Sequence, residues 1–338
     1  MTLPLALLVA SGAMAGPMVG PGDTALRHDI QRLADYGVIK GPITTWPLAW
    51  DAIVADIEAT ENGDDLPQDL MDAINRVRAK AHRNMQERGL TFEGHASIAE
   101  KPTRIRSFQN TPRESAEVGA GVSYRNDWFN ISLSGQAVDG LSHGVAVNSP
   151  KGGKAIHNDN SMIGVKLGNY SINANTLDRW WGPGWDGSLI LSSNARPMPA
   201  ISIDRDSTAA FESKWLGWIG PWDVSMHFAK MESDRFVPNT RVFAMRVNIK
   251  PFPSLELGVS RIAQWCGNGR PCRLSTFEKL LTGRDNRGQA GVTQENEPGN
   301  QQSGFDARWS TRILDRPVAF YGQYIGADES KRVPAANF

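Results

Sequence analysis

The stretch TRVFAMRVNIKPFPSLELGVSRIAQW, residues 240–265, contains two alternating runs on either side of a short turn. In each run every second side chain is apolar, and the residues between them are mostly polar or charged. The apolar positions are Phe243, Met245, Val247, Ile249, Leu255, Leu257 and Val259. A repeat of two residues is the period of a β-strand, and Pro251 and Pro253 mark the turn. The stretch therefore predicts two long antiparallel strands.

The same period of two recurs from about residue 91 onward, in roughly ten to twelve segments bounded by turn residues. Clear examples are SAEVGAGVSYR (115–125), DWFNISLSGQAVDG (127–140) and GFDARWSTRI (304–313). Two architectures explain such strands. One is a sheet with one face on a core and the other in water. The other is a membrane barrel with lipid outside and a wet lumen.

Three features favour the barrel. The strands are long for a sandwich. Tight turns at 168–169, 220–221 and 251–253 alternate with long polar loops at 139–160, 178–208 and 266–303. Tryptophan and tyrosine also gather near strand ends, where the interface of a bilayer places them. We therefore predict a mainly β fold, a transmembrane antiparallel β-barrel, over residues 91–338.

Before the strands the period is 3.6 residues, which predicts three amphipathic helices in a small bundle over residues 16–90. Asp23 is expected to cap the first helix, which stops at Gly37. Thr45 is expected to cap the second, with Pro47 in its first turn. Residues 1–15 resemble a signal peptide, because an apolar run precedes the small-residue pattern Ala13-Met14-Ala15. No apolar run of 18 or more residues occurs, so we expect no transmembrane helix.

The composition restricts the partners. Lysine plus arginine and aspartate plus glutamate both number 36, so the formal net charge is zero and we expect no nucleic-acid partner. Cys266 and Cys272, in CGNGRPC, are a candidate disulfide if the protein is exported, with two free thiols as the alternative. The chain carries none of the common catalytic motifs and no metal-ligand spacing, so we expect neither an enzyme nor a cofactor.

The segment LDRWWGPGWDGSLILSSNARPMPA, residues 177–200, is the candidate binding site. Indole rings stack on the apolar faces of sugars, whereas amides, carboxylates and guanidinium groups bind sugar hydroxyls. The candidate carbohydrate-binding residues are Arg179, Trp180, Trp181, Trp185, Asp186, Asn194 and Arg196. A place in the aromatic belt at the membrane interface, or in a plug at the end of a barrel, is the equal alternative for Trp180 and Trp181. Trp185, between glycines in a loop, favours binding.

Several motifs occur together in one order along the chain. They are TTWPLAWDAI (44–53), RWWGPGWDGSLI (179–190), NARPM (194–198), PFPSLELGVSRIAQW (251–265), ENEPGNQQSGFD (295–306) and VAFYGQYIGADES (318–330). In these motifs the chain resembles the Wzi capsule assembly family. The resemblance implies an outer-membrane barrel of about eighteen strands, closed on the periplasmic side by the helices. It also implies a surface lectin that anchors capsular polysaccharide and is not an enzyme. Family members are longer, so C-terminal strands are expected to be missing here.

We therefore expect a monomeric outer-membrane protein, in contact with lipid, that binds capsular polysaccharide or exopolysaccharide through Arg179, Trp185, Asp186 and Arg196. Asn194 is expected to orient sugar hydroxyls. Two alternatives stay open. A charged lumen would suit a porin-like channel, and a carboxylate pair such as Asp178 with Asp186 would suit a secreted glycosidase.

Overall fold

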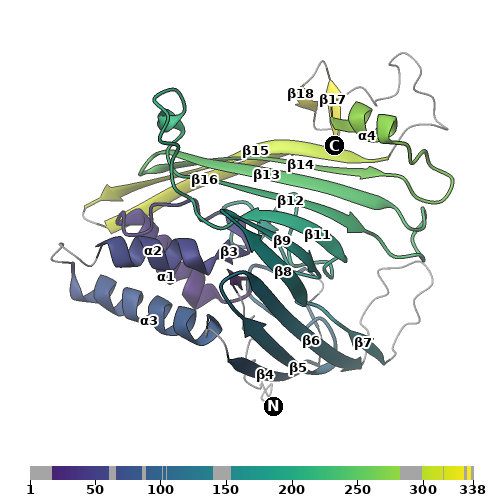
Figure 1. The fold of residues 1–338 in the computed structure, drawn as a ribbon, viewed down its shortest axis with the longest axis horizontal. Coiled ribbons are helices and arrows are strands. Elements are labelled where there is room, and N and C mark those ends of the chain that lie inside the picture. Colours follow the sequence, from purple (N-terminus) through teal and green to yellow (C-terminus); the bar gives the residue numbers. More distant parts are fainter. Residues whose placement is uncertain are drawn as a thin grey trace, which may run out of the picture.

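The computed structural model describes residues 17–60, 66–85, 89–139 except 101 and 104, 154–281, and 299–335 except 315, 331 and 332. The predicted signal peptide, residues 1–15, lies outside the described residues. The described chain forms a long, curved antiparallel sheet with a group of helices against one end of it (Figure 1). Among these residues, no helix is both long enough and apolar enough to cross a bilayer.

The N-terminal part contains three helices and short strands. These are β1 (Met18–Val19), α1 (Thr24–Asp35), β2 (Thr45–Trp46), β3 (Leu48–Ala49), α2 (Trp50–Thr60) and α3 (Gln68–Asn84). The Asp23 side chain accepts a hydrogen bond from the Leu26 amide, as its predicted role as the cap of α1 requires. Gly37, with φ of +80°, follows α1 and turns the chain. The predicted cap of α2 at Thr45 is wrong, because Thr45 pairs in a strand and α2 begins at Trp50.

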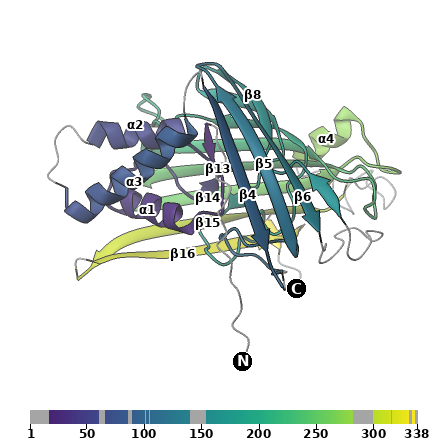
Figure 2. The ribbon, with the colours of Figure 1, turned by 90° about the horizontal axis from the view of Figure 1, so that it is seen from below.

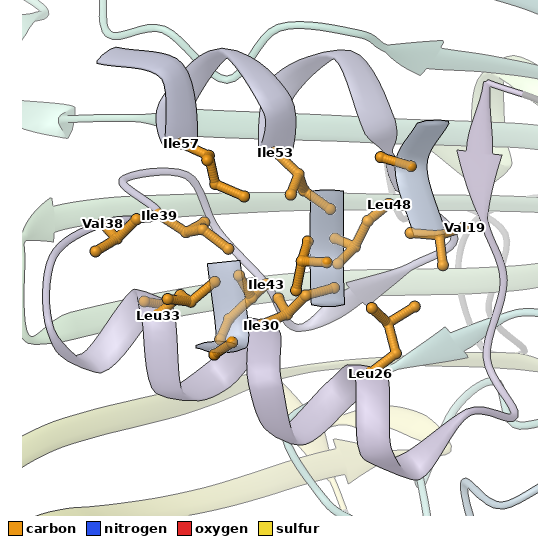
Figure 3. Close-up of a cluster of buried hydrophobic side chains, with 14 of the residues drawn as sticks. Val19, Leu26, Ile30, Leu33, Val38, Ile39, Ile43, Leu48, Ile53 and Ile57 are labelled. Carbon is orange, nitrogen blue, oxygen red and sulfur yellow. The ribbon is translucent and has the colours of Figure 1, made fainter. Parts of the chain in front are cut away.

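The helices pack around an apolar core. Ile30, Leu33, Ile53, Ile57 and other aliphatic side chains from α1, α2 and the intervening loop point toward one another in Figure 3. Each helix has one apolar stripe, so it is stable only against the others. Phe108 and Trp180, from distant parts of the chain, complete the same core. The helical part is therefore joined to the rest of the molecule through its core.

The main sheet has twelve strands, all paired antiparallel. Its spatial order is β16 (Arg316–Gly326), β15 (Gln301–Ile313), β14 (Leu255–Trp265), β13 (Arg241–Phe252), β12 (Trp222–Lys230), β11 (Ala200–Arg205), β9 (Tyr170–Asn175), β8 (Met162–Leu167), β6 (Phe129–Asp139), β5 (Ala116–Arg125) and β4 (Leu90–Ile98), with β7 (Ala155–His157) also on β6. Figure 2 shows the sheet curving around the helices, with β4 and β16 at its two edges. These edges are not paired with each other, so the sheet of the described residues is open. The predicted absence of C-terminal strands stays a prediction.

The two faces of this sheet have opposite chemistry. The concave face is buried and polar, whereas the convex face is exposed and apolar. Buried concave residues include Asn173, Ser202, Asp204, Ser225, Arg246, Asn248, Ser260 and Asp306. Exposed convex residues include Phe92, Leu133, Ile163, Ile201, Val259, Phe305 and Phe320. A water-soluble sheet buries its apolar face, so this arrangement is the one expected when lipid surrounds the sheet.

The predicted turns are partly right. Turns at Gly168–Asn169 and around Ser254 join neighbouring strands, as predicted. The predicted tight turn at 220–221 is wrong, because residues 206–221 form an irregular connection that includes a 3₁₀ turn, Gly217–Ile219. The predicted long loop at 178–208 is also wrong in its second half, where β11 forms. The sequence does not predict β11, because Ile201 and Ile203 are its only regularly alternating apolar residues.

The helical part lies against the end of the sheet where the tight turns are, which we call the turn end; the opposite end is the loop end. The Glu256 carboxylate accepts hydrogen bonds from the Ile43 and Thr44 amides at 3.1 and 2.9 Å. Arg308 forms an ion pair with Asp35 of α1 at 2.7 Å. Backbone and side chains of the helical part thus supply partners to part of the polar concave face.

At the loop end lie three smaller features. Cys266 and Cys272 are joined as a disulfide just after β14. A short helix, α4 (Leu274–Leu281), follows and packs on the convex face of the sheet. Residues 282–298 of the predicted long loop at 266–303 lie outside the described residues. The strands β17 (Asp328–Ser330) and β18 (Val333–Ala335) pair with each other.

Candidate functional site

Residues 176–199 leave β9 at the loop end, enter the concavity of the sheet and return to β11; we call them the inner loop. Trp180 and Trp181 form strand β10, which pairs with Trp46 and Thr45 of β2. The Gly182 amide donates to the Thr44 carbonyl at 2.9 Å. The inner loop is therefore held directly by the helical part, in the middle of the curved sheet.

The first two tryptophans of the inner loop are fully buried. The Trp180 ring packs edge-on against Phe108 at 5.4 Å, and its indole nitrogen donates to the Gly184 carbonyl. The Trp181 ring packs against the imidazole of His227 at 5.3 Å. No ligand can stack on either ring without rearrangement of the core, so the geometry favours packing for both, and their binding role stays a prediction.

Trp185 is half-buried and has a different neighbour. Its ring and that of Phe108 enclose the Arg27 guanidinium of α1, at 4.5 and 4.2 Å from the ring centroids. Arg27 also donates to the carbonyls of Pro183 and Gly184. Burial lowers the pKa of Arg27 to about 9. The role predicted for Trp185 in sugar binding is untested, and the structure adds a contact in which it covers a buried cation.

Arg179, Asp186 and Asn194 lie in three separate environments. Arg179 is buried, 3.7 Å from the Asp204 carboxylate of the concave face. Asp186 is exposed. Asn194 is exposed too, and its side-chain oxygen accepts from the Arg106 amide at 3.1 Å. The structure therefore does not bring these three candidates together in one site.

Arg196 belongs to a charged network at the loop end. Its guanidinium contacts the Asp159 carboxylate and donates to Glu114 at 2.7 Å. Arg113 joins Asp159 to Asp178, with N–O distances of 3.1 and 2.9 Å. Burial raises the pKa of Asp159, and the neighbouring Arg196 and Arg113 oppose that shift. The network fixes the inner loop to the segments before β5 and β8.

Two cavities adjoin this network. One, beside Arg106, Arg113 and the inner faces of β4–β6, has a volume of about 80 Å³. The other, which we call the vestibule, has a volume of about 350 Å³ and lies between the inner loop and the loop-end halves of β12–β15. Pockets for small ligands begin at roughly 300 Å³, so of these two cavities the vestibule is the one with room for a sugar residue.

The vestibule is lined mostly by apolar side chains, such as Leu191, Val242 and Ile262, and also by cations, amides and Asp178. Its lining includes Arg179, Arg196, Met198, Arg235, Gln264, Asn300 and Gln302. The side-chain amides of Gln264 and Gln302 make no hydrogen bond to another described residue. Amide groups of this kind offer both donors and acceptors to a ligand hydroxyl. The vestibule can thus bind a neutral or acidic polyol.

Sequence analysis missed Gln264 and Gln302 as candidate binding residues. Both project from the concave face of strands that are adjacent in the sheet, β14 and β15. They lie inside two of the motifs that carry the family resemblance, so a signal was present in the sequence. It could not be used, because nothing in the motifs shows which cavity a side chain enters.

The described residues define a class of protein: mainly β, with a large antiparallel sheet that is polar inside, apolar outside and filled by a helical part. Comparison with known proteins agrees with this class. Residues 84–337 match the model of the capsule assembly protein Wzi family. This chain belongs to the Wzi capsule assembly family.

Two similar proteins extend this finding. An uncharacterised 55.8 kDa protein of the cps region of Klebsiella pneumoniae is 34% identical over 340 residues. The solved structure of Wzi from Escherichia coli, an outer membrane protein involved in group 1 capsule assembly and a carbohydrate-binding β-barrel, is 29% identical with a TM-score of 0.76. The matches cover 98% and 95% of this chain, but 63% and 66% of the relatives. The chain thus spans slightly less than two thirds of each.

Proposed function

We propose that this protein is an outer-membrane component of capsule assembly that binds capsular polysaccharide or a related exopolysaccharide. Binding in the vestibule would help to hold the polymer at the cell surface. Family membership and the likeness to Escherichia coli Wzi support a place in the outer membrane and a role in capsule assembly. The sheet is apolar on its convex face and polar on its concave face, which supports a convex surface that faces lipid. In this orientation the helical part lies on the periplasmic side, and the vestibule opens toward the outside.

The observation that carries the proposal is the vestibule itself. A sugar ring needs hydrogen-bond partners around its edge, and Gln264, Gln302 and the guanidinium of Arg196 line one cavity. Its floor is rigid, because the inner loop is held by β2 and by the charged network. A rigid site loses little conformational entropy on binding, which favours affinity.

Ion pairs in the interior of the sheet favour a binding protein over a diffusion pore. Three of the lumen charges that would suit a channel, Arg246, Arg308 and Asp306, are in ion pairs. Arg246 donates to both oxygens of Asp306 at 2.6 and 2.9 Å and to Thr44 and Thr45 of the helical part. Asp178, one acid of the pair considered for hydrolysis, is held by Arg113. These contacts support a plugged binding protein without an enzymatic step.

The proposal is tested by binding of the purified, detergent-solubilised protein to the capsular polysaccharide of its own host. The double variant Gln264→Ala/Gln302→Ala is expected to bind about tenfold or more weakly, because each lost hydrogen bond is worth about 0.5–1.5 kcal/mol. Gln301→Ala is the matched control, since Gln301 lies one position away on the convex face. Equal affinity of the double variant and the wild type would overturn the vestibule as the site.

A further inference from the structure

The convex face carries a row of basic and aromatic side chains at the loop end, on the opposite side of the sheet from the vestibule. Lys230 of β12 is directly opposite Arg241 of β13, and Arg241 is directly opposite Trp265 of β14. Lys230 and Arg241 are both exposed, and the Arg241 guanidinium lies 5.4 Å from the Trp265 ring. We call these three residues the basic row.

The two cations of the basic row have no counter-ion among the described residues. Like charges directly opposite each other on adjacent strands destabilise a sheet, because their β-carbons are only about 4.5–5.5 Å apart. The nearby carboxylate of Glu232 does not compensate them, since Arg235 binds it at 2.8 Å. The pair Lys230–Arg241 is therefore a site at which an anion would be stabilised.

Directly below the basic row the convex face becomes apolar. The next row toward the middle of the sheet consists of Ile201, Phe228, Phe243 and Ala263. A groove of about 470 Å³ joins the basic row to Ile201 and Phe228 of the apolar row. Phe243 and Ala263 of the apolar row are buried beneath α4. The groove joins a cationic end to an apolar end. A ligand that fits both ends has an anionic head and a hydrocarbon tail.

Helix α4 holds the aromatic border of this groove. Phe277 packs against the rings of Phe243 and Trp265 at 5.5 and 4.9 Å, and Leu280 is fully buried. The Arg261 guanidinium binds the carbonyls of Leu280 and Leu281 at the end of α4. Figure 1 shows α4 on the outer side of β13 and β14. The Trp265 ring is thus fixed by α4 at the loop end of β14, beside the two cations.

We propose that the basic row and its groove bind a phosphate-bearing lipid of the outer leaflet. Arg241 and Lys230 contact the phosphate, the first as a planar fork and the second as a point charge. An acyl chain follows the groove past Phe228 and Ile201. The inference rests on the outer-membrane placement proposed above, but it concerns the other face of the strands that line the vestibule.

The test measures binding of lipid A, which carries phosphate groups, to the delipidated full chain in detergent, by native mass spectrometry. The double variant Lys230→Gln/Arg241→Gln is expected to bind lipid A at least tenfold more weakly. The control Lys214→Gln/Arg316→Gln removes the same charges from exposed positions at the turn end and is expected to bind normally. Dephosphorylated lipid A is expected to bind as weakly as the double variant does.

A second variant keeps both cations. Ile201→Trp fills the groove and is expected to weaken lipid A binding too, so the proposal stays testable if the double variant fails to fold. Unchanged binding by either variant, equal binding of the dephosphorylated lipid, or competition by inorganic phosphate as strong as by lipid A would overturn the proposal. Polysaccharide binding should be unchanged in the basic-row variants, and lipid binding unchanged in Gln264→Ala/Gln302→Ala. The two proposals can therefore fail separately.

Discussion

The helical part and the sheet obey opposite rules of burial within one chain. In the helical part, Ile30, Leu33, Ile74 and Val77 are fully buried among apolar neighbours. In the sheet, Arg246 and Asn248 are just as buried, while Val259 and Phe305 are exposed. The comparison shows that hydrophobic periodicity predicts which side chains share a face, but the solvent decides which face is turned inward.

The strongest test of the comparison removes one partner from the buried polar side. Asp306→Ala leaves the Arg246 guanidinium, which is 0% exposed, without its carboxylate. An unpaired buried charge of this kind costs about 3–5 kcal/mol, so we expect a clear fall in the free energy of unfolding. Urea denaturation of the protein folded into lipid vesicles measures it. A loss below 1 kcal/mol, within the usual scatter of surface mutants, would mean that water reaches Arg246.

A second prediction tests what surrounds the convex face. Val259→Arg places a charge on a side chain that is 62% exposed. In water such a change is nearly neutral, but at the middle of a bilayer it costs about 2–4 kcal/mol. The same unfolding measurement in vesicles shows whether Val259 faces water or lipid. Asn75→Arg, on the exposed side of α3, is the control and should change the free energy of unfolding by less than about 0.5 kcal/mol.

A third prediction concerns the junction of the two regions, where Asp51 of α2 pairs with Arg125 and Lys166 of the sheet. Burial opposes ionisation of Asp51, but Lys166 and Arg125 outweigh it and lower the pKa below the usual 3.8. A lowered folded-state pKa stabilises the fold above pH 3.8, and this contribution is lost as the pH falls through the folded-state value. Asp51→Asn should remove about 1–2 kcal/mol at neutral pH.

The readout for Asp51 is limited proteolysis of the helical part as a function of pH. We expect the wild type to become more sensitive only as the pH falls below 3.8, toward the lowered folded-state pKa of Asp51. The variant should already be more sensitive at pH 7 and should lose this further change below pH 3.8. A variant with the steep pH dependence of the wild type would assign the transition to another carboxylate.

The smallest expected effect compares conservative changes in the two regions. Ile74→Val in the helical core should cost about 0.5–1.5 kcal/mol, because it leaves a small cavity among packed side chains. Ile163→Val on the convex face, where the side chain is 45% exposed, should cost less, since lipid fills the space. Chemical denaturation of both variants in vesicles checks the difference. Equal losses would indicate that Ile163 also packs against protein.

Much of this fold could be predicted from the sequence because the relevant signals are local. The alternation in 240–265 gave the correct faces of β13 and β14, and Asp23 gave the start of α1. The inner loop could not be predicted, since its path depends on contacts such as Trp180 with Trp46, far apart in the sequence. For the same reason, the buried positions of Trp180 and Trp181 and the separation of Arg179 from Asn194 were not visible in the residue pattern. Clustered candidates in one loop need not share one site.

The contacts of residues 43–45 with the concave face also affect how the protein is assembled in the membrane. Glu256, Arg246 and Asn248 find their partners on residues 43–45, so the concave wall is electrostatically complete only when that segment is already in place. A sheet that formed before this segment was in place would leave these groups without their partners on residues 43–45 at the moment of insertion. We therefore expect the helical part to fold first and the later strands to assemble around it. A chain whose residues 17–85 are supplied after the strands have entered a bilayer should recover its native form slowly or not at all.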